Sequence, residues 1–414
     1  MENHYQVIIV GGGQAGLSVA YGLQEKGIKY IIFEKNEIAS SWKNKRWDKF
    51  CLVTPNFQCR LPGYSYSGDD PEGFMQKDEI VDFVKGYAAT FNPNIKEGVE
   101  VIEVSKNEQS IFEVTTSLGA FTSEEVVIAA GNFHSPIIPP VAKKMDPSIK
   151  QLHSSEYKNP EQLEEGEILV VGTGQSGCQI AEDLHLAGKK VHLAVGDAPR
   201  SPRRYRGKDV VQWLEEMGYY DIAIEDHPDG LAVRKKTNHY LTGRDGGKEI
   251  DLRQFALEGM QLYGLLTDAD KESFSFGTNL EKDLDKADTS YERIKAKIDS
   301  YIDKKGIKTA EKEPVYKPVW KPDTPVTSLD NKETNITTVI WCIGWGFDFS
   351  WIKLPILDEK GYPEYNRGVT KEKGLYFIGM AWMHTWGSGR FSGIAPDAEY
   401  LGDYIAESLL VSKK

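Results

Sequence analysis

Two glycine-rich segments of almost the same sequence constrain the fold of this chain more than any other feature. The first, VGGGQAG, covers residues 10–16, and the second, VGTGQSG, covers residues 171–177. Each follows a short apolar run, at 5–10 and at 167–171, and each precedes apolar residues at helical spacing. A strand, a G-x-G-x-x-G turn and a helix in this order begin a dinucleotide-binding βαβ unit. Two copies in this context are far more specific than one.

The first unit has the residues that an adenine dinucleotide without a 2′-phosphate requires. Gly11 permits a sharp turn, Gly13 lets the backbone approach a pyrophosphate, and Gly16 lets the helix pack closely on the strand. The helix N-terminus offers free N–H groups and a positive dipole to that pyrophosphate. The next strand ends in Glu34, whose carboxylate accepts hydrogen bonds from ribose hydroxyls and repels a 2′-phosphate. The first unit therefore predicts an FAD or NAD site.

The second unit lacks that carboxylate. Its turn is formed by Gly172, Gly174 and Gly177. At the position that corresponds to Glu34 stands Val195, and the following segment, GDAPRSPRRYRGK, carries four arginines. Because guanidinium groups are good partners of a 2′-phosphate, we predict an NADPH site to which Arg200 and Arg203 contribute. Asp197 leaves an alternative open, since its carboxylate could bind ribose hydroxyls and favour NADH.

The length and composition of the chain restrict the class of protein to which it can belong. The chain has 414 residues, which suits two or three domains, and 40% hydrophobic and 27% charged residues are typical of a soluble globular protein. A net charge of −12 argues against nucleic-acid binding. We recognise no bilayer-spanning run and no secretory signal. The four cysteines lack CxxC spacing, which favours a reducing cytoplasm and indicates no metal site.

Further segments repeat the pattern of strand and glycine. EEVVIAAG at 124–131 and ITTVIWCIGWG at 336–346 are apolar strands followed by glycine, and residues 373–409 contain a last strand, a glycine-rich loop and a helix. With SSWKNKRWDKFCL at 40–52, this order resembles the flavin-containing monooxygenases, including YUCCA-type enzymes and their bacterial relatives, among the two-dinucleotide-domain flavoproteins. The tryptophan that lies against the flavin in that family is Trp42 here, with Arg46 nearby.

The resemblance implies an α/β fold of two Rossmann-like domains. Residues 1–160 and 333–414 would form the FAD domain, and residues 161–332 would form an NADPH domain inserted in it. Within that insert, residues 240–252 predict a hairpin around two glycines. Residues 281–304 predict a charged surface helix that either faces solvent or forms a lid over the substrate.

The resemblance also implies an activity, that of an NADPH-dependent flavoprotein monooxygenase. NADPH would reduce FAD, and the reduced flavin would capture dioxygen as a C4a-(hydro)peroxide that oxygenates a small organic substrate. HSSEY at 153–157 matches the end of a family motif, but Pro147 and Ile149 replace its phenylalanine and glycine. That departure argues against a Baeyer–Villiger reaction. The expected partners are a small-molecule substrate and dioxygen, without nucleic acid or membrane, and a homodimer is the default expectation.

Two other functions stay open. An NAD(P)H-dependent flavin reductase or electron-transfer flavoprotein shares the domain plan, but its dithiol form needs a close cysteine pair beside the flavin, which this sequence lacks. A non-catalytic dinucleotide sensor is the other alternative. Glu34 and the aromatic residues of the C-terminal loop argue against it.

We predict Asn56, Asn132 and Trp386 as catalytic residues. The two amides could bond the flavin, and the indole could exclude water from it, although turn formation and core packing are the ordinary roles of these residue types. The predicted cofactor-binding residues belong to the two turns, the strand ends after them and the loops that the resemblance places around the flavin. They are Gly11, Gly13, Gln14, Ala15, Gly16, Glu34, Lys35, Trp42, Arg46, Val101, Ala130, Gly131, Gly172, Gly174, Gln175, Ser176, Gly177, Arg200, Arg203, Gly344, Arg390 and Ile394.

Overall fold

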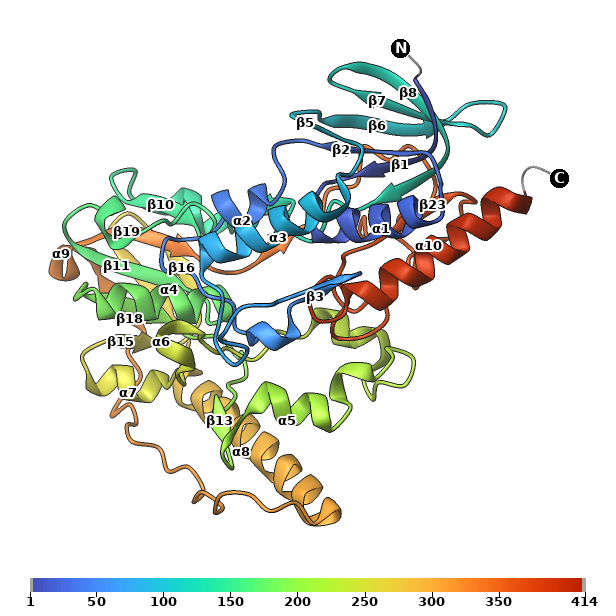
Figure 1. Ribbon diagram of the computed structural model, residues 1–414. Coiled ribbons are helices and arrows are strands. Elements are labelled where there is room, and N and C mark those ends of the chain that lie inside the picture. Colours follow the sequence, from blue (N-terminus) through green and yellow to red (C-terminus); the bar gives the residue numbers. More distant parts are fainter. Residues whose placement is uncertain (1–2, 412–414) are drawn as a thin grey trace.

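The computed structural model describes residues 3–411, which form two α/β bodies, each built on a parallel sheet (Figure 1). The first body takes its strands from both ends of the chain, and the second is inserted between them. This arrangement confirms the predicted fold class of two Rossmann-like domains, one inside the other.

The first sheet has a parallel centre in the order β23-β8-β1-β2-β5. Its strands are β1 (His4–Val10), β2 (Tyr30–Glu34), β5 (Ile95–Glu97), β8 (Gly119–Ile128) and β23 (Leu375–Phe377). Antiparallel strands extend it beyond β8, where β7 (Phe112–Thr116) pairs with β8 and β22 (Val369–Thr370) pairs with β23; β6 (Val101–Lys106) and β21 (Tyr365–Asn366) follow them.

Both faces of this sheet are buried, which explains why its strands are almost continuously apolar. Val7 and Ile9 of β1 pack against three helices on one face of the sheet, and Ile8 and Val10 are buried on its other face. The helices are α1 (Gln14–Glu25), α3 (Lys77–Phe91) and α10 (Ile394–Val411). The C-terminal helix α10, red in Figure 1, lies beside α1.

The second sheet is wholly parallel in the order β10-β19-β11-β12-β15. Its strands are β10 (Lys150–His153), β11 (Glu167–Val171), β12 (Val191–Ala194), β15 (Gln261–Tyr263) and β19 (Ile336–Trp341), and α4 (Gln175–Leu186) follows β11. β10 and β19 lie outside residues 161–332, so the strands of this body need wider boundaries than the sequence predicts.

Smaller elements complete both bodies. The helices are α2 (Ser40–Asn44), α5 (Val210–Glu216), α6 (Arg244–Gly247), α7 (Leu252–Leu257), α8 (Leu280–Lys305) and α9 (Asn331–Thr334). The strands are β3 (Arg60–Leu61), β4 (Tyr64–Ser65), β9 (Ser135–Pro136), β13 (Arg204–Tyr205), β14 (Lys208–Asp209), β16 (Leu266–Ala269), β17 (Ser273–Phe276), β18 (Ser328–Asp330) and β20 (Trp345–Gly346). In the part of the chain that the structure describes, no helix is both long and apolar enough to cross a membrane.

Two local predictions for the insert have different outcomes. The helix expected at 281–304 is α8. It is not exposed on all sides, because one of its faces is buried. The hairpin expected at 240–252 is wrong, because this segment forms the short helix α6 and turns. Gly247 serves close packing instead, since a Cβ atom there would lie 2.5 Å from Cε2 of Phe74.

Burial of one carboxyl group in the first sheet makes stability depend on pH. Glu125 of β8 is 3% exposed, and burial raises the pKa of its carboxyl group to about 7. The pKa in the unfolded chain is about 4.3. The folded state therefore favours the protonated form, and this contribution to stability is present below pH 4.3 and lost as the pH rises to about 7.

We therefore expect Glu125→Gln, which stays uncharged, to match the wild type near pH 4 and to exceed its unfolding free energy at pH 8 by about 1–3 kcal/mol. Urea denaturation at both pH values measures this difference. Glu124→Gln, at the neighbouring and more exposed carboxylate, is the control. A Glu125→Gln effect of equal size at both pH values would contradict the assignment.

Candidate dinucleotide-binding site

The first glycine turn, between β1 and α1, has a geometry that depends on glycine at two positions. Gly11 has φ +109°, and a Cβ atom there would lie 2.5 Å from the carbonyl oxygen of Ala129. A Cβ atom on Gly16 would collide with the carbonyl oxygen of Gly11. At Gly13, in contrast, no atom lies within 4 Å of the Cβ position, so this face of the turn is open. The backbone can therefore be approached closely at Gly13.

The second turn, between β11 and α4, repeats this geometry. Gly172 has φ +103°, and its Cβ position lies 2.8 Å from the carbonyl oxygen of Cys342. A Cβ atom on Gly177 would collide with the carbonyl oxygen of Gly172. The Cβ position of Gly174 meets only Cγ2 of Thr237, at 3.9 Å. The chain thus builds the same cradle twice, with an open face at the same glycine of each turn.

Both helices begin without a side-chain cap. Gly13 is the N-cap of α1 and Gly174 is the N-cap of α4, and neither helix has a capping hydrogen bond from a side chain. Their first N–H groups therefore remain available to an anion, and the helix dipole favours negative charge at this end.

Glu34 lies at the end of β2, beside the first turn. Its carboxylate accepts hydrogen bonds from the N–H groups of Gly12 at 2.7 Å and Asn36 at 2.9 Å. The neighbouring Lys35 pairs with Glu100 at 2.7 Å. Next to this pair, Val101 begins β6. The predicted acidic group thus lies next to the turn, where a ribose would be bound.

Aromatic and cationic side chains gather at the start of α1. Trp42 Nε1 donates to Gln14 Oε1 at 3.3 Å, and the Gln14 amide donates to the carbonyl oxygen of Gly389 at 3.2 Å. The Trp42 ring stacks on Phe391 with centroids 5.6 Å apart. The guanidinium group of Arg46 lies 5.1 Å from the Trp42 ring centroid. Segments from both ends of the chain therefore meet beside the first turn.

Two arginines in this region lack a carboxylate partner among the described residues. Arg46 donates to the carbonyl oxygen of Lys45, and Arg390 donates to Trp386 and Asn238. Burial lowers the pKa of each guanidinium group to about 10. Both side chains are half-buried, and a partly desolvated cation without a counter-ion is costly, so both positions suit an anionic ligand. The Trp386 ring lies against Arg390, 4.0 Å from its guanidinium group to the ring centroid.

The two predicted asparagines differ in availability. Asn56 is buried, and its amide donates to the carbonyl oxygen of Asp70 and accepts from the N–H of Met75. The structure therefore gives Asn56 a loop-forming role and corrects its prediction as a catalytic residue. Asn132 makes no side-chain hydrogen bond to the residues that the structure describes, and it follows Gly131, which has φ +74°.

The other predicted cofactor residues lie at the ends of strands and helices. Ala130 follows β8 beside Gly11, and Gly344 follows β19 and accepts from His153 at 3.1 Å when Nε2 carries the proton. Ile394 begins α10. In the second turn, Gln175 bonds the backbone of Leu241, and the remaining turn residues are Ala15 in α1 and Ser176 in α4.

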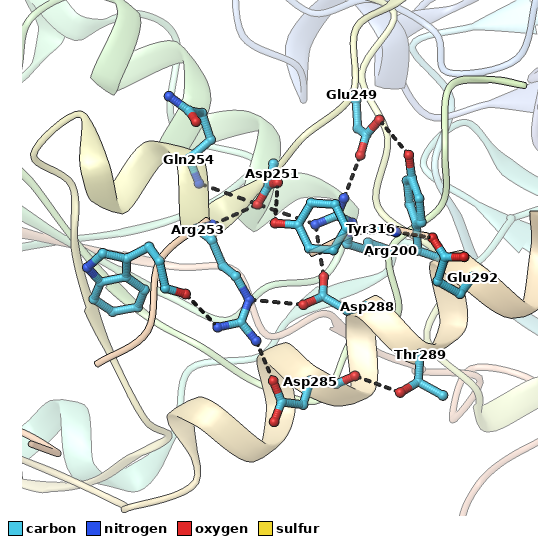
Figure 2. Close-up of polar contacts among 12 residues, drawn as sticks. Arg200, Glu249, Asp251, Arg253, Gln254, Asp285, Asp288, Thr289, Glu292 and Tyr316 are labelled. Carbon is cyan, nitrogen blue, oxygen red and sulfur yellow. Dashed lines mark hydrogen bonds and ion pairs between the residues drawn. The ribbon is translucent and has the colours of Figure 1, made fainter. Parts of the chain in front are cut away.

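The prediction that Arg200 and Arg203 bind a phosphate is wrong, because both guanidinium groups are buried and neutralised by carboxylates. Arg203 donates to both carboxylate oxygens of Asp209, at 2.7 and 2.5 Å. Arg200 pairs with Glu249 at 2.5 Å and Asp288 at 2.9 Å (Figure 2). The partners of Arg200 lie far away in the sequence, so no local sequence pattern predicts these ion pairs.

Comparisons with known proteins agree with this geometry. The pyridine nucleotide-disulphide oxidoreductase family matches residues 8–257, which is more than half of the chain. The chain belongs to this family. An uncharacterised CzcO-like oxidoreductase of Geobacillus kaustophilus is 33% identical over 97% of this chain and 98% of its own length. The family assignment confirms the predicted resemblance to the two-domain flavoproteins.

One further relative and one solved structure of similar fold are named as monooxygenases. A probable indole-3-pyruvate monooxygenase of Arabidopsis thaliana, YUCCA3, is 31% identical over 53% of each chain. The solved flavin-containing monooxygenase of Stenotrophomonas maltophilia has the same fold, with a TM-score of 0.66 and 16% identity over 99% of this chain and 100% of its own. The chain is therefore an oxidoreductase of this family with the fold of a flavin monooxygenase.

The correction at Arg203 can be tested directly. Removing one partner of a buried ion pair leaves the other charge uncompensated, so we expect Arg203→Gln to lower the free energy of unfolding by about 3 kcal/mol. Arg204→Gln, at the exposed next residue, should change it by less than about 0.5 kcal/mol. Urea denaturation measures both values. A stable Arg203→Gln variant that has lost only nucleotide affinity would restore the phosphate-binding role.

Proposed function

We propose that this protein is an NADPH-dependent flavoprotein monooxygenase that oxygenates a small organic substrate. In this proposal the first turn binds FAD and the second binds NADPH. FAD, when bound, supplies the hydride acceptor and activates dioxygen at its C4a position. The single observation that carries the proposal is the pair of matching cradles with open faces at Gly13 and Gly174. The relatives named as monooxygenases support the choice of reaction.

The residues around the first cradle suit FAD. The uncapped start of α1 would hold the pyrophosphate, and Glu34 would accept hydrogen bonds from the ribose hydroxyls. Trp42 and Phe391 would lie beside the flavin ring, with Arg46 as a nearby cation for its anionic reduced form. The second cradle offers the same features at α4 but lacks a carboxylate equivalent to Glu34.

Residues of the second body cover the loop that precedes α10. The N–H of Ile224 donates to the carbonyl oxygen of His384 at 2.7 Å, and Arg234 donates to that of Trp382 at 3.1 Å. Trp386 packs against Tyr220 with centroids 4.6 Å apart. In a monooxygenase such a cover would keep water from the reduced flavin while oxygen is transferred.

The cysteines argue against disulphide reduction, although the family name includes it. All four cysteines lie within the described residues and are free. Burial raises the pKa of Cys51 to about 11 and that of Cys59 to about 12, and it also raises the pKa values of Cys178 and Cys342. The thiolate is the reactive form in thiol–disulphide exchange, so none of these thiols is activated for it.

Alanine substitutions at Gly13 and Gly174 test nucleotide binding at the two cradles independently. Gly13 and Gly174 have φ −75° and −63°, which alanine adopts without strain, so both variants should fold. We expect Gly13→Ala to weaken FAD binding about tenfold or more, and Gly174→Ala to weaken NADPH binding by a similar factor while FAD stays bound. Flavin absorbance per protein and calorimetric titration with NADP⁺ measure the two effects.

Gly22→Ala, at a half-buried position of α1 where the added methyl meets no atom within 4 Å, is the control for both variants. The assignment of the cradles is disproved if Gly13→Ala retains FAD with unchanged affinity, or if Gly174→Ala releases it.

Oxygen transfer needs its own experiment. We expect NADPH consumption by the FAD-loaded protein, screened with amines, thioethers, ketones, indoles and keto acids, to yield an oxygenated product from at least one class. Product formed and hydrogen peroxide released are measured against NADPH consumed. Product that accounts for most of the NADPH supports a monooxygenase. Release of all the electrons as hydrogen peroxide with every class would indicate an oxidase or a reductase.

A further inference from the structure

With Arg200 and Arg203 engaged elsewhere, other residues must distinguish NADPH from NADH at the second cradle. The question rests on the proposed function, since it concerns the nucleotide that this cradle binds. Dinucleotide-binding folds read the 2′ position of the adenosine ribose with residues at the end of the second strand and just after it. Here that segment follows β12.

The two cradles differ at this strand end. β2 and β12 pair in the same register with the strands before the turns, so Val195 corresponds to Glu34. In the first cradle the Glu34 carboxylate bonds the N–H of Gly12. In the second, Thr173 occupies the position of Gly12, and its hydroxyl accepts from the N–H of Gly196 at 3.0 Å. The Thr173 hydroxyl thus forms the hydrogen bond between turn and strand end that the Glu34 carboxylate forms in the first cradle.

Asp197 directly follows Gly196 and carries the next side chain along the sequence. Its carboxylate pairs with the ammonium group of Lys286 on α8 at 2.7 Å, and the two side chains are 67% and 59% exposed. Hydrogen bonding to Asp197 raises the pKa of Lys286. An exposed ion pair contributes at most about 1 kcal/mol to stability, so a ligand can replace either partner at little cost.

Ion pairs to two buried arginines hold the helix that carries Lys286. Its neighbours Asp285 and Asp288 both pair with the buried Arg253, at 2.5 and 2.9 Å, and Asp288 also pairs with Arg200 (Figure 2). These contacts fix the rotation of α8 at the turn from which Lys286 projects. Arg200, which the sequence suggests as a phosphate ligand, therefore helps to hold the turn of α8 that carries Lys286.

We propose that Asp197 and Lys286 together determine the nucleotide specificity of the second cradle. Lys286 donates to the 2′-phosphate of NADPH, and Asp197 accepts a hydrogen bond from the 2′-hydroxyl of NADH. Either nucleotide breaks the ion pair and uses one of its partners. The protein therefore accepts both nucleotides, and the two side chains act on the choice in opposite directions.

Calorimetric titration of the FAD-loaded protein with 2′,5′-ADP and with 5′-AMP isolates the 2′-phosphate from the rest of the nucleotide. Lys286→Gln should weaken 2′,5′-ADP binding about tenfold and leave 5′-AMP binding unchanged. Asp197→Asn should strengthen 2′,5′-ADP binding and weaken 5′-AMP binding. Lys304→Gln, at an exposed lysine near the end of the same helix, should change neither affinity.

The KM values for NADPH and NADH should move in the same two directions, with the rate at saturation little changed. If the ratio of the two ligand affinities is the same in wild type, Lys286→Gln and Asp197→Asn, the inference is overturned while the proposed function stands. If the wild-type protein binds neither 2′,5′-ADP nor 5′-AMP, the proposed function fails at the second cradle, and this inference fails with it.

Discussion

The structure depends on a close backbone contact that only glycine permits, made once in each body. Gly16 and Gly177 approach the carbonyl oxygens of Gly11 and Gly172 so closely that no side chain fits between them. This contact presses the start of each helix against the end of the strand before it. The uncapped N–H groups of α1 and α4 then point out of the carboxyl ends of their sheets, where ligands bind in open α/β folds.

The arginines of this protein differ in whether a carboxylate neutralises them. The chain carries a net charge of −12, and most of its buried arginines pair with carboxylates, as Arg200 and Arg203 do. Arg46 and Arg390 have no such partner among the described residues and lie beside Trp42 and Trp386. A half-buried guanidinium group without a counter-ion costs free energy in the absence of an anion. We therefore propose that these two residues lie beside the negative charge of a bound ligand.

Local patterns predict the parts of the fold and site that local residues determine. The two turns, the buried strands and Glu34 follow from spacing alone, because each depends on residues within one βαβ unit. Arg200 is different, since its carboxylate partners stand at 249, 251 and 288. Asn56 likewise bonds the backbone at 70 and 75. The pattern of residues 240–252 resembles a hairpin turn, but Gly243 and Gly247 allow close contact with Phe74 and Leu52, which no sequence pattern reveals.

The central claim is that the two cradles hold their nucleotides so that a nicotinamide meets a flavin. Anaerobic stopped-flow absorbance at the flavin band, with the FAD-loaded protein mixed with NADPH or with NADPH deuterated at the transferred position, tests it most directly. We expect the flavin to be bleached in a single turnover and deuterium to slow the bleaching. A protein that takes up FAD but is reduced by neither NADPH nor NADH would contradict it.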